Sequence, residues 1–271
     1  MVLFFLVMPL IAVIPISFSS SPFLEFTPGM IALDPEAFSL RWYRLLIGDC
    51  SDPGITTVCS DRWILGAQNS LFIGIIATFL ATTLGIMAAL GLSRPYMPFR
   101  KAIMAIMISP LIVPLIITAS SVFFFFAKLN LVATFTGLIF SHTILGLPFV
   151  VITVTATLVG YDHNLTRAAA SLGGGPLRNF FKVEMPLILP GVISGALFAF
   201  ITSFDEVVIV MFMASLDQLT IPKQMWAGIR QEISPVILCM ATCLVVLSIL
   251  LLTTVELLRR RSEKLRGITS K

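Results

Sequence analysis

The chain has 271 residues, of which 57% are hydrophobic and only 12% are charged, and its mean hydropathy is +1.00. Soluble globular proteins carry about 45–50% apolar and about 25% charged residues, so this composition cannot cover a soluble domain, and much of the surface must face lipid. The net charge of +4 does not indicate nucleic-acid binding, because the basic residues fall in short runs between apolar segments, without a basic face that carries interleaved aromatic side chains.

Six apolar segments are long enough, or nearly so, for the roughly 20 residues that a helix needs to cross a bilayer. They are residues 1–18, 64–92, 102–127, 131–159, 187–213 and 236–258. The first lacks the basic start and the small-residue cleavage site of a signal peptide, so we expect it to be a retained helix. The sequence therefore predicts an all-α membrane protein with six transmembrane helices.

Lysine and arginine are distributed unevenly between the loops on the two sides of such a bundle. Twelve lie on one side: Arg94, Arg100, Lys101, Arg167, Arg178, Lys182, Arg259, Arg260, Arg261, Lys264, Arg266 and Lys271. Six lie on the other: Arg41, Arg44, Arg62, Lys128, Lys223 and Arg230. Since basic loops stay inside, we expect both termini in the cytoplasm and the segment 20–63 outside.

Prolines lie inside several of the expected spans, and those of the third and fourth are the candidates for kinks. Pro110 and Pro114 lie in the third, and Pro148 lies in the fourth. A proline removes one helical hydrogen bond, which a membrane bundle tolerates where neighbouring helices satisfy the freed carbonyl. These residues are candidates for a pliable, gate-lining helix, and a static kink in a packed bundle is the alternative.

The four cysteines form two pairs without further soft ligands nearby, which argues against a zinc or other metal site. Cys239 and Cys243 lie four residues apart in an apolar helix, and we expect both to be small core residues. Cys50 and Cys59 lie in the polar external segment and are candidates for a disulfide if that segment faces an oxidising compartment.

The most informative loop is GYDHNLTRAAASLGGGPLRNFFKVEMP, residues 160–186. Asn164 is the expected N-cap of a helix over 165–172, about 12 Å long. Three glycines stop this helix, and Pro176 is suited to open a second helix that runs into Pro186. A short helix, a turn and a second helix, without an arranged nucleophile or base, favour a surface held by another protein over a catalytic site.

This loop resembles the cytoplasmic signature of the permeases of binding-protein-dependent ABC importers, which reads Glu-Ala-Ala, three residues, Gly, nine residues, Ile-x-Leu-Pro. The matching residues are Ala168, Ala169, Gly173 and Pro186, with Val183 and Met185 as conservative replacements. Arg167 stands where the family usually has glutamate. It reverses a charge at the contact with the ATPase subunit that the resemblance implies.

The resemblance extends over residues 64–256, through the motifs NSL at 69–71, LSR at 92–94 and the prolines of the third span. It implies a permease domain there, preceded by a peripheral first helix (1–19) and an external loop (20–63) and followed by a basic cytoplasmic tail (257–271). The sequences SFDEV at 203–207, TIP at 220–222 and IR with ISP between 229 and 235 resemble the spermidine/putrescine subgroup most, although permeases for other amines share them.

The family resemblance implies a bacterial inner-membrane complex of two permease subunits, two ATP-binding subunits and a periplasmic solute-binding protein. The chain contains no phosphate-binding loop of the GxxxxGK[ST] kind. We therefore expect no enzymatic activity and no cofactor in this chain, with ATP and magnesium held by the partner ATPase. Its own partners would be those subunits and the lipid bilayer.

Asp205 and Glu206 fall inside the expected fifth span, about 27 Å from its start if it is helical throughout. Acids inside a span usually face a water-filled cavity or a partner charge. We interpret them as a cation-attracting site on the substrate pathway. Because neighbouring residues on a helix point about 100° apart, we expect at most one of them to face the pore squarely, and Asp205 is the first choice. The alternatives are a structural pair with the second permease, or local unwinding that places the acids at the interface.

The sequence thus favours an importer permease that passes a small cationic solute inward, such as spermidine or putrescine. Other amines, amino-acid-like solutes and iron-containing solutes are the rival substrates. A secondary transporter would not need the coupling loop, and a membrane-embedded enzyme would need a constellation that His142 and His163 do not supply. We expect His142 to be hydrogen-bonded in the bundle and His163 to be solvated.

Overall fold

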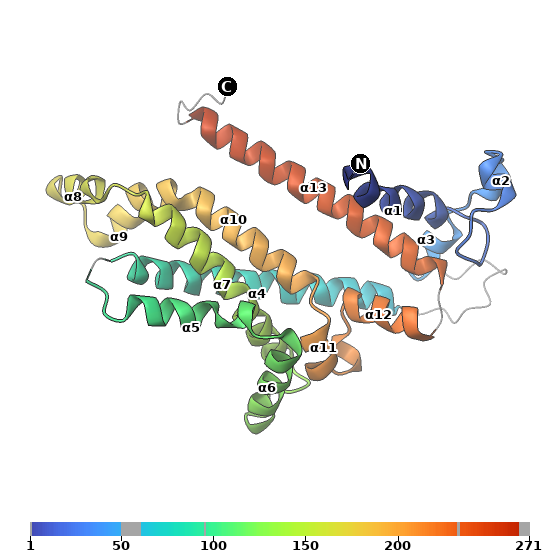
Figure 1. The fold of residues 1–271 in the computed structure, drawn as a ribbon, viewed down its shortest axis with the longest axis horizontal. Coiled ribbons are helices and arrows are strands. Elements are labelled where there is room, and N and C mark those ends of the chain that lie inside the picture. Colours follow the sequence, from blue (N-terminus) through green and yellow to red (C-terminus); the bar gives the residue numbers. More distant parts are fainter. Residues whose placement is uncertain (1, 50–60, 95, 232–233, 266–271) are drawn as a thin grey trace. The chain divides into compact units, whose positions relative to one another are not determined.

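A computed structural model describes residues 2–49, 61–94, 96–231 and 234–265 of the chain (Figure 1). Within these ranges the fold is helical, and extended backbone pairs only at one antiparallel bridge, between Ser19 and Phe38. The chain divides into two compact units, Met1–Gly66 with Gln224–Lys271, and Ala67–Lys223. The predicted all-α fold class is confirmed.

Four helical stretches of the described chain are long and apolar enough to cross a membrane: α4 (Arg62–Leu92), α7 (Phe135–Val159), the run Pro176–Phe204 that ends in α10 (Met185–Phe204), and Pro235–Thr254 of α13 (Pro235–Leu265). The pair α5 (Arg100–Ile112) and α6 (Leu115–Lys128) makes a fifth if it is counted as one span. The helix α1 (Val2–Ser17) reaches about 24 Å, less than the roughly 30 Å of a bilayer core. The structure therefore supports four or five of the six expected spans.

The third expected span is not one straight helix. The axes of α5 and α6 differ by 105° across a short break. Val113 ends α5 in extended backbone and Pro114 caps α6, because the residue before a proline is driven out of the helical region. Pro110 and Pro148 lie inside α5 and α7, and neither helix ends there. Among the expected kink residues, only Pro114 breaks a helix.

The second unit is built around α7, which packs along α10 and is buried over most of its length (Figure 1). The close approach of the helices depends on glycines that face Val150 of α7. A Cβ at Gly85 of α4 would lie 2.6 Å from Val150 Cγ1, and one at Gly195 of α10 would lie 2.8 Å from Val150 Cα. Without a hydrophobic force between helices in lipid, such small residues allow the packing that holds a bundle together.

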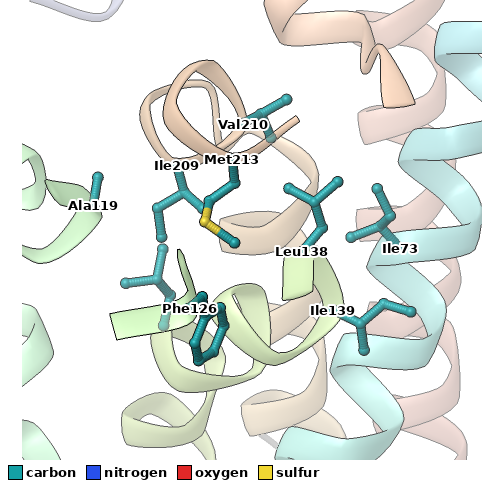
Figure 2. Packing of buried hydrophobic residues seen from close by; sticks show 9 residues of the cluster. Ile73, Ala119, Phe126, Leu138, Ile139, Ile209, Val210 and Met213 are labelled. Carbon is teal, nitrogen blue, oxygen red and sulfur yellow. The ribbon is translucent and has the colours of Figure 1, made fainter. Parts of the chain in front are cut away.

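A second cluster fixes α11 (Val208–Met213) in the same unit. Figure 2 shows side chains of α11 turned toward those of α4, α6 and α7. The buried members are Ile73, Ala119, Phe126, Leu138, Ile139, Leu145, Ile209, Val210 and Met213. The short helix after α10 is therefore part of the core of this unit.

In the first unit, α1 and the segment that follows it both pack against α13. This segment, expected as a loop, contains α2 (Pro28–Ile31), a 3₁₀ turn (Pro35–Ala37) and α3 (Arg41–Leu46). The indole Nε1 of Trp42 donates to the Ser19 carbonyl at 2.9 Å, and the Ser17 and Tyr43 hydroxyls share a hydrogen bond of 2.7 Å. These contacts fix α3 to the end of α1.

Of the two cysteines in α13, Cys239 is buried as expected and donates to the Ser17 carbonyl at 3.2 Å. Cys243 lies one turn further along the same face of α13 but is exposed, so its prediction as a core residue is wrong. Cys50 and Cys59 lie outside the described residues. The helix α13 continues to Leu265, so part of the expected basic tail is helical.

Gly195→Ala and Gly91→Ala form a matched pair that tests the packing of α10 on α7. A Cβ at Gly195 meets backbone atoms of α7, whereas a Cβ at Gly91, near the end of α4, meets nothing within 4 Å. Overpacking should cost Gly195→Ala about 1–3 kcal/mol, and Gly91→Ala should gain about 0.5–1 kcal/mol in helix stability. Thermal unfolding in detergent should show shifts of opposite sign, and an equal or higher midpoint for Gly195→Ala would contradict the packing.

Candidate functional site

The expected coupling helix exists as α8, His163–Ser171. Its N-cap is Asp162, whose carboxylate accepts from the Asn164 amide at 2.9 Å, so the prediction of Asn164 as the cap is wrong. Asp162 is the N-cap because its side-chain oxygen accepts a hydrogen bond from an amide of the first turn that has no acceptor within the helix. His163 is exposed, as expected, and its ring meets that of Tyr161 edge-on.

The glycine run closes α8 with two backbone hydrogen bonds. The Gly174 amide donates to the Ala169 carbonyl and the Gly173 amide donates to the Ala170 carbonyl, both at 3.0 Å. This pairing is the Schellman arrangement, which needs one residue in the left-handed region. Gly173 supplies it with φ of +81°. The backbone conformation at this position of the motif therefore favours glycine.

A contact that the sequence did not indicate joins α8 to the next helix, α9 (Pro176–Asn179). The Asn179 side chain is buried and donates from Nδ2 to the Gly174 carbonyl at 3.0 Å. A Cβ at Gly174 would lie 2.8 Å from the Ala169 carbonyl oxygen and would collide with Asn179. Gly174 and Asn179 thus stabilise the turn. Neither residue belongs to the motif, so this contact could be found only in the folded structure.

The loop presents large apolar side chains to solvent. Leu172 is 90% exposed and Leu177 is 74% exposed, and Leu165 and Phe181 are exposed as well. Arg167 and Ala168 are exposed on α8, and Ala169 is half-buried. Exposed apolar side chains that gather on a polar surface mark an interaction site. The leucines are therefore part of the candidate surface, although the motif did not single them out.

The other motif residues occupy a different place. Val183 lies in a π-helical turn, Phe180–Glu184, and Met185 begins α10. Met185 packs against the buried cluster of α4, α7 and α10, and Pro186 is exposed in the first turn of α10. Val183, Met185 and Pro186 therefore connect the loop to the helix bundle, whereas Arg167 and Ala168 lie on the exposed part of the loop.

The two acids lie between helices rather than inside one. The helix α10 ends at Phe204, Asp205 is its C-cap, and α11 begins at Val208. The expected continuous span over 187–213 is therefore wrong at its second end. The break is stabilised by Glu206, whose buried carboxylate accepts from the Ile209 amide at 2.8 Å and so satisfies the first turn of a new helix.

Charges complement both ends of the short helix α11. Glu206 lies at its positive N-terminal end, and at its other end the Lys223 ammonium donates to the Ala214 carbonyl at 3.1 Å. Burial lowers the pKa of the Lys223 ammonium. Glu206 therefore has a structural task, which matches the alternative of local unwinding more closely than a position on a continuous helix.

Asp205 differs from Glu206 in its exposure and in its hydrogen bonding. It is exposed, and within the described ranges no hydrogen bond or ion pair reaches its carboxylate. A negative charge at the C-terminal end of a helix is unfavourable by about 0.3–1 kcal/mol. A carboxylate that costs stability where it stands, and bonds to nothing in its own chain, is available to a ligand.

His142 lies behind this turn. Its Nδ1 shares a hydrogen bond of 2.8 Å with the Ser203 hydroxyl, two residues before Asp205, and both side chains are buried. The expectation that His142 is hydrogen-bonded in the bundle is confirmed. The bond ties the last turn of α10 to α7 and so fixes where Asp205 begins the break.

Two motifs that lie about 150 residues apart in sequence meet in the structure. Asn69 donates from Nδ2 to the carbonyls of Asp217 and Leu219, both at 2.9 Å, and the Ser70 hydroxyl accepts from the Ile221 amide at 2.9 Å. Gln218 adds a bond to the Ala133 carbonyl at 2.8 Å. The segment between α11 and α12 (Ile221–Gln231) is thus held to the start of α4 and to the turn before α7.

Comparison with known proteins places this geometry in a family. Residues 81–264 match the family described as "Binding-protein-dependent transport system inner membrane component". The chain is 29% identical to the spermidine/putrescine transport system permease protein PotC of Escherichia coli (strain K12), over 98% of this chain and 92% of that protein. It is 30% identical to the putrescine transport system permease protein PotI of the same strain, over 88% and 80%.

Solved structures show the same fold at low sequence identity. A bacterial ABC transporter involved in the import of the acidic polysaccharide alginate matches with a TM-score of 0.66 and 14% identity, covering 96% of this chain and 91% of that one. The MetNI methionine ABC transporter matches with a TM-score of 0.54 and 21% identity, covering 76% and 96%. With the family match over most of its length, the chain belongs to the binding-protein-dependent transport system inner membrane components, the permeases of ABC importers.

Proposed function

We propose that this permease passes a polyamine, such as spermidine or putrescine, into the cytoplasm, and that Asp205 attracts the cation on its path. The observation that carries the proposal is the exposed Asp205 carboxylate, which has no partner among the described residues, at the break between α10 and α11. The names of PotC and PotI, relatives at 29% and 30% identity, support the substrate class. Other amines, amino-acid-like solutes and iron-containing solutes are the alternatives.

The strength of the attraction follows from the surroundings of the acid. At about 4 Å and an effective dielectric constant near 20, a carboxylate and an ammonium attract by about 4 kcal/mol before desolvation is subtracted. If only a quarter of this remained, occupancy of the site would still change several-fold. An acid at this position can therefore decide whether cations are preferred.

The energy of transport would come from outside the chain. The relatives are permease subunits, and we propose that two ATP-binding subunits hold ATP and magnesium, that a second permease completes the pathway, and that a periplasmic binding protein delivers the solute. The docking surface for an ATP-binding subunit would be the exposed part of α8 and its turn, with Leu172 as the most exposed apolar side chain and Arg167 beside it. This surface requires that α8 lies in the cytoplasm.

Reporter cysteines test the orientation, after the native cysteines are replaced. A cysteine at Ser171, exposed on α8, should be shielded from impermeant thiol reagents in intact cells, because twelve of the eighteen basic residues place that side in the cytoplasm. A cysteine at Glu36, exposed in the segment after α1, should be labelled. The reverse labelling pattern would place α8 outside and remove the docking role.

Leu172→Asp tests the docking surface. The side chain is 90% exposed, so the change should leave the fold intact but should reduce recovery of the ATP-binding subunit with the purified permease several-fold. Tyr96→Asp, 96% exposed in the loop between α4 and α5, is the matched control and should leave recovery unchanged. Equal recovery from both variants, with normal uptake, would argue that the partner docks elsewhere.

Asp205→Asn and Glu206→Ala should separate substrate attraction from structure. Asp205→Asn removes an exposed charge that is unfavourable at the end of α10, so uptake of putrescine should fall several-fold while the thermal midpoint stays the same or rises slightly. Glu206→Ala removes the oxygen that accepts from the Ile209 amide, which should cost about 0.5–2 kcal/mol of stability. Normal putrescine uptake by Asp205→Asn would contradict the role of this carboxylate.

A further inference from the structure

The segment after α1 exposes an unusual number of large apolar side chains. We call Phe23, Leu24, Phe26, Ile31, Leu33 and Ile47 the 23–47 apolar set; their exposed fractions run from 39% for Leu24 to 77% for Leu33. A loop that faced only water would rarely gather so many, because soluble surfaces keep their exposed apolar patches small. None of these residues belongs to the proposed docking surface on α8 or to the proposed substrate pathway at Asp205.

The segment begins at the depth of a membrane span. The Ser17 carbonyl, at the end of α1, accepts from the Cys239 thiol, and Cys239 lies four residues, or about 6 Å, inside the apolar stretch that starts at Pro235. The Tyr43 hydroxyl of α3 bonds to the Ser17 hydroxyl at 2.7 Å. Both the start of the segment and α3 are therefore level with the first turns of α13.

Backbone hydrogen bonds keep the rest of the segment close to this level. The Ser39 amide donates to the Phe18 carbonyl at 2.7 Å, and the Ser20 amide donates to the Ala37 carbonyl at 3.0 Å. Residues 20–37 thus form a loop whose two ends are fixed at the end of α1. The polar layers of a bilayer extend about 5–8 Å beyond the hydrocarbon core on each side, so the two ends of this loop lie within reach of the headgroups.

Leu33 is an independent sign of an outside partner. Its φ is +57°, a left-handed conformation at the end of α2 where glycine or asparagine is usual. Its side chain is 77% exposed, so no packing within the chain offsets the strain. An exposed leucine in this conformation is unusual, and contact with an apolar phase outside the chain would remove its side chain from water.

We propose that the 23–47 apolar set inserts into the membrane–water interface beside α1 and α13, so that the segment is a peripheral membrane anchor. The helix α1, which packs along the membrane-spanning α13, also exposes large apolar side chains, including Phe5, Met8 and Ile11. Because the segment starts at the end of α1 and its α3 packs against α13, it is attached beside a membrane span, which favours the bilayer over a docked protein. Charged side chains in the segment, such as Glu25 and Glu36, are exposed. An interface accommodates such a mixture because apolar groups enter it while carboxylates remain in water.

Site-directed spin labels test the anchor in the full transporter, reconstituted with its ATP-binding subunits into phosphatidylethanolamine–phosphatidylglycerol liposomes. Single labels at Ile31 and Leu33, in a background without native cysteines, should collide with oxygen several-fold more than with a water-soluble nickel chelate. A label at Ile249, exposed on the apolar stretch of α13, is the lipid control, and one at Glu36 is the water control. Each labelled variant must retain uptake, which shows that it is folded and assembled.

Labels at Ile31 and Leu33 that match Glu36 would place the set in water and overturn the proposal. Shielding that arises only after the solute-binding protein is added would also overturn it, in favour of a protein docking site. Leu33→Asn supplies a second readout, because asparagine tolerates φ of +57° and so keeps the backbone. In this variant the nickel accessibility of a label at Ile31 should rise several-fold, and an unchanged value would count against the anchor.

Discussion

Lipid offers no hydrogen-bond partner, so every backbone amide that leaves a helix in or beside the membrane must find one within the protein. The break after α10 occurs where a side chain meets that need. Glu206 caps the helix that follows α10, and Asn69 and Ser70 hold the segment between α11 and α12, which contains a 3₁₀ turn. Polar side chains from distant parts of the sequence therefore stabilise the interruption of the bundle near Asp205.

This constraint separates two adjacent acids that look alike. Glu206 is buried and committed to the backbone of α11, whereas Asp205 is exposed and lies at the unfavourable end of α10. His142 and Ser203 fix the last turn of α10 from behind. His142 and Ser203 thus fix the position of the exposed Asp205 carboxylate, which we propose attracts the cation.

The same reasoning applies to the coupling loop. Backbone hydrogen bonds of its glycines and the Asn179 side chain close the turn, and the exposed part of the loop presents large apolar side chains next to Ala168 and Arg167. We propose that this surface passes the movement of an ATP-binding subunit to the bundle by direct contact, because hydrogen bonds hold the turn in one conformation. The motif residues Val183 and Met185 connect the turn to the start of α10.

Hydropathy alone determined the fold class and the approximate position of most helices, because lipid as a solvent leaves an apolar segment few choices but to be helical. The motif alone located the coupling helix and the turn that needs Gly173 in a left-handed conformation. Only the tertiary structure decided where helices stop inside apolar runs. Pro114 turns α6 by 105° from α5, although Pro110 and Pro148 leave their helices unbroken. Likewise, Asn69 meets the segment before Ile221, and Asn179 meets Gly174, through contacts that depend on how the chain returns to itself. Such partners cannot be derived from local pattern, since a helix end is stabilised by whichever side chain the fold brings to it.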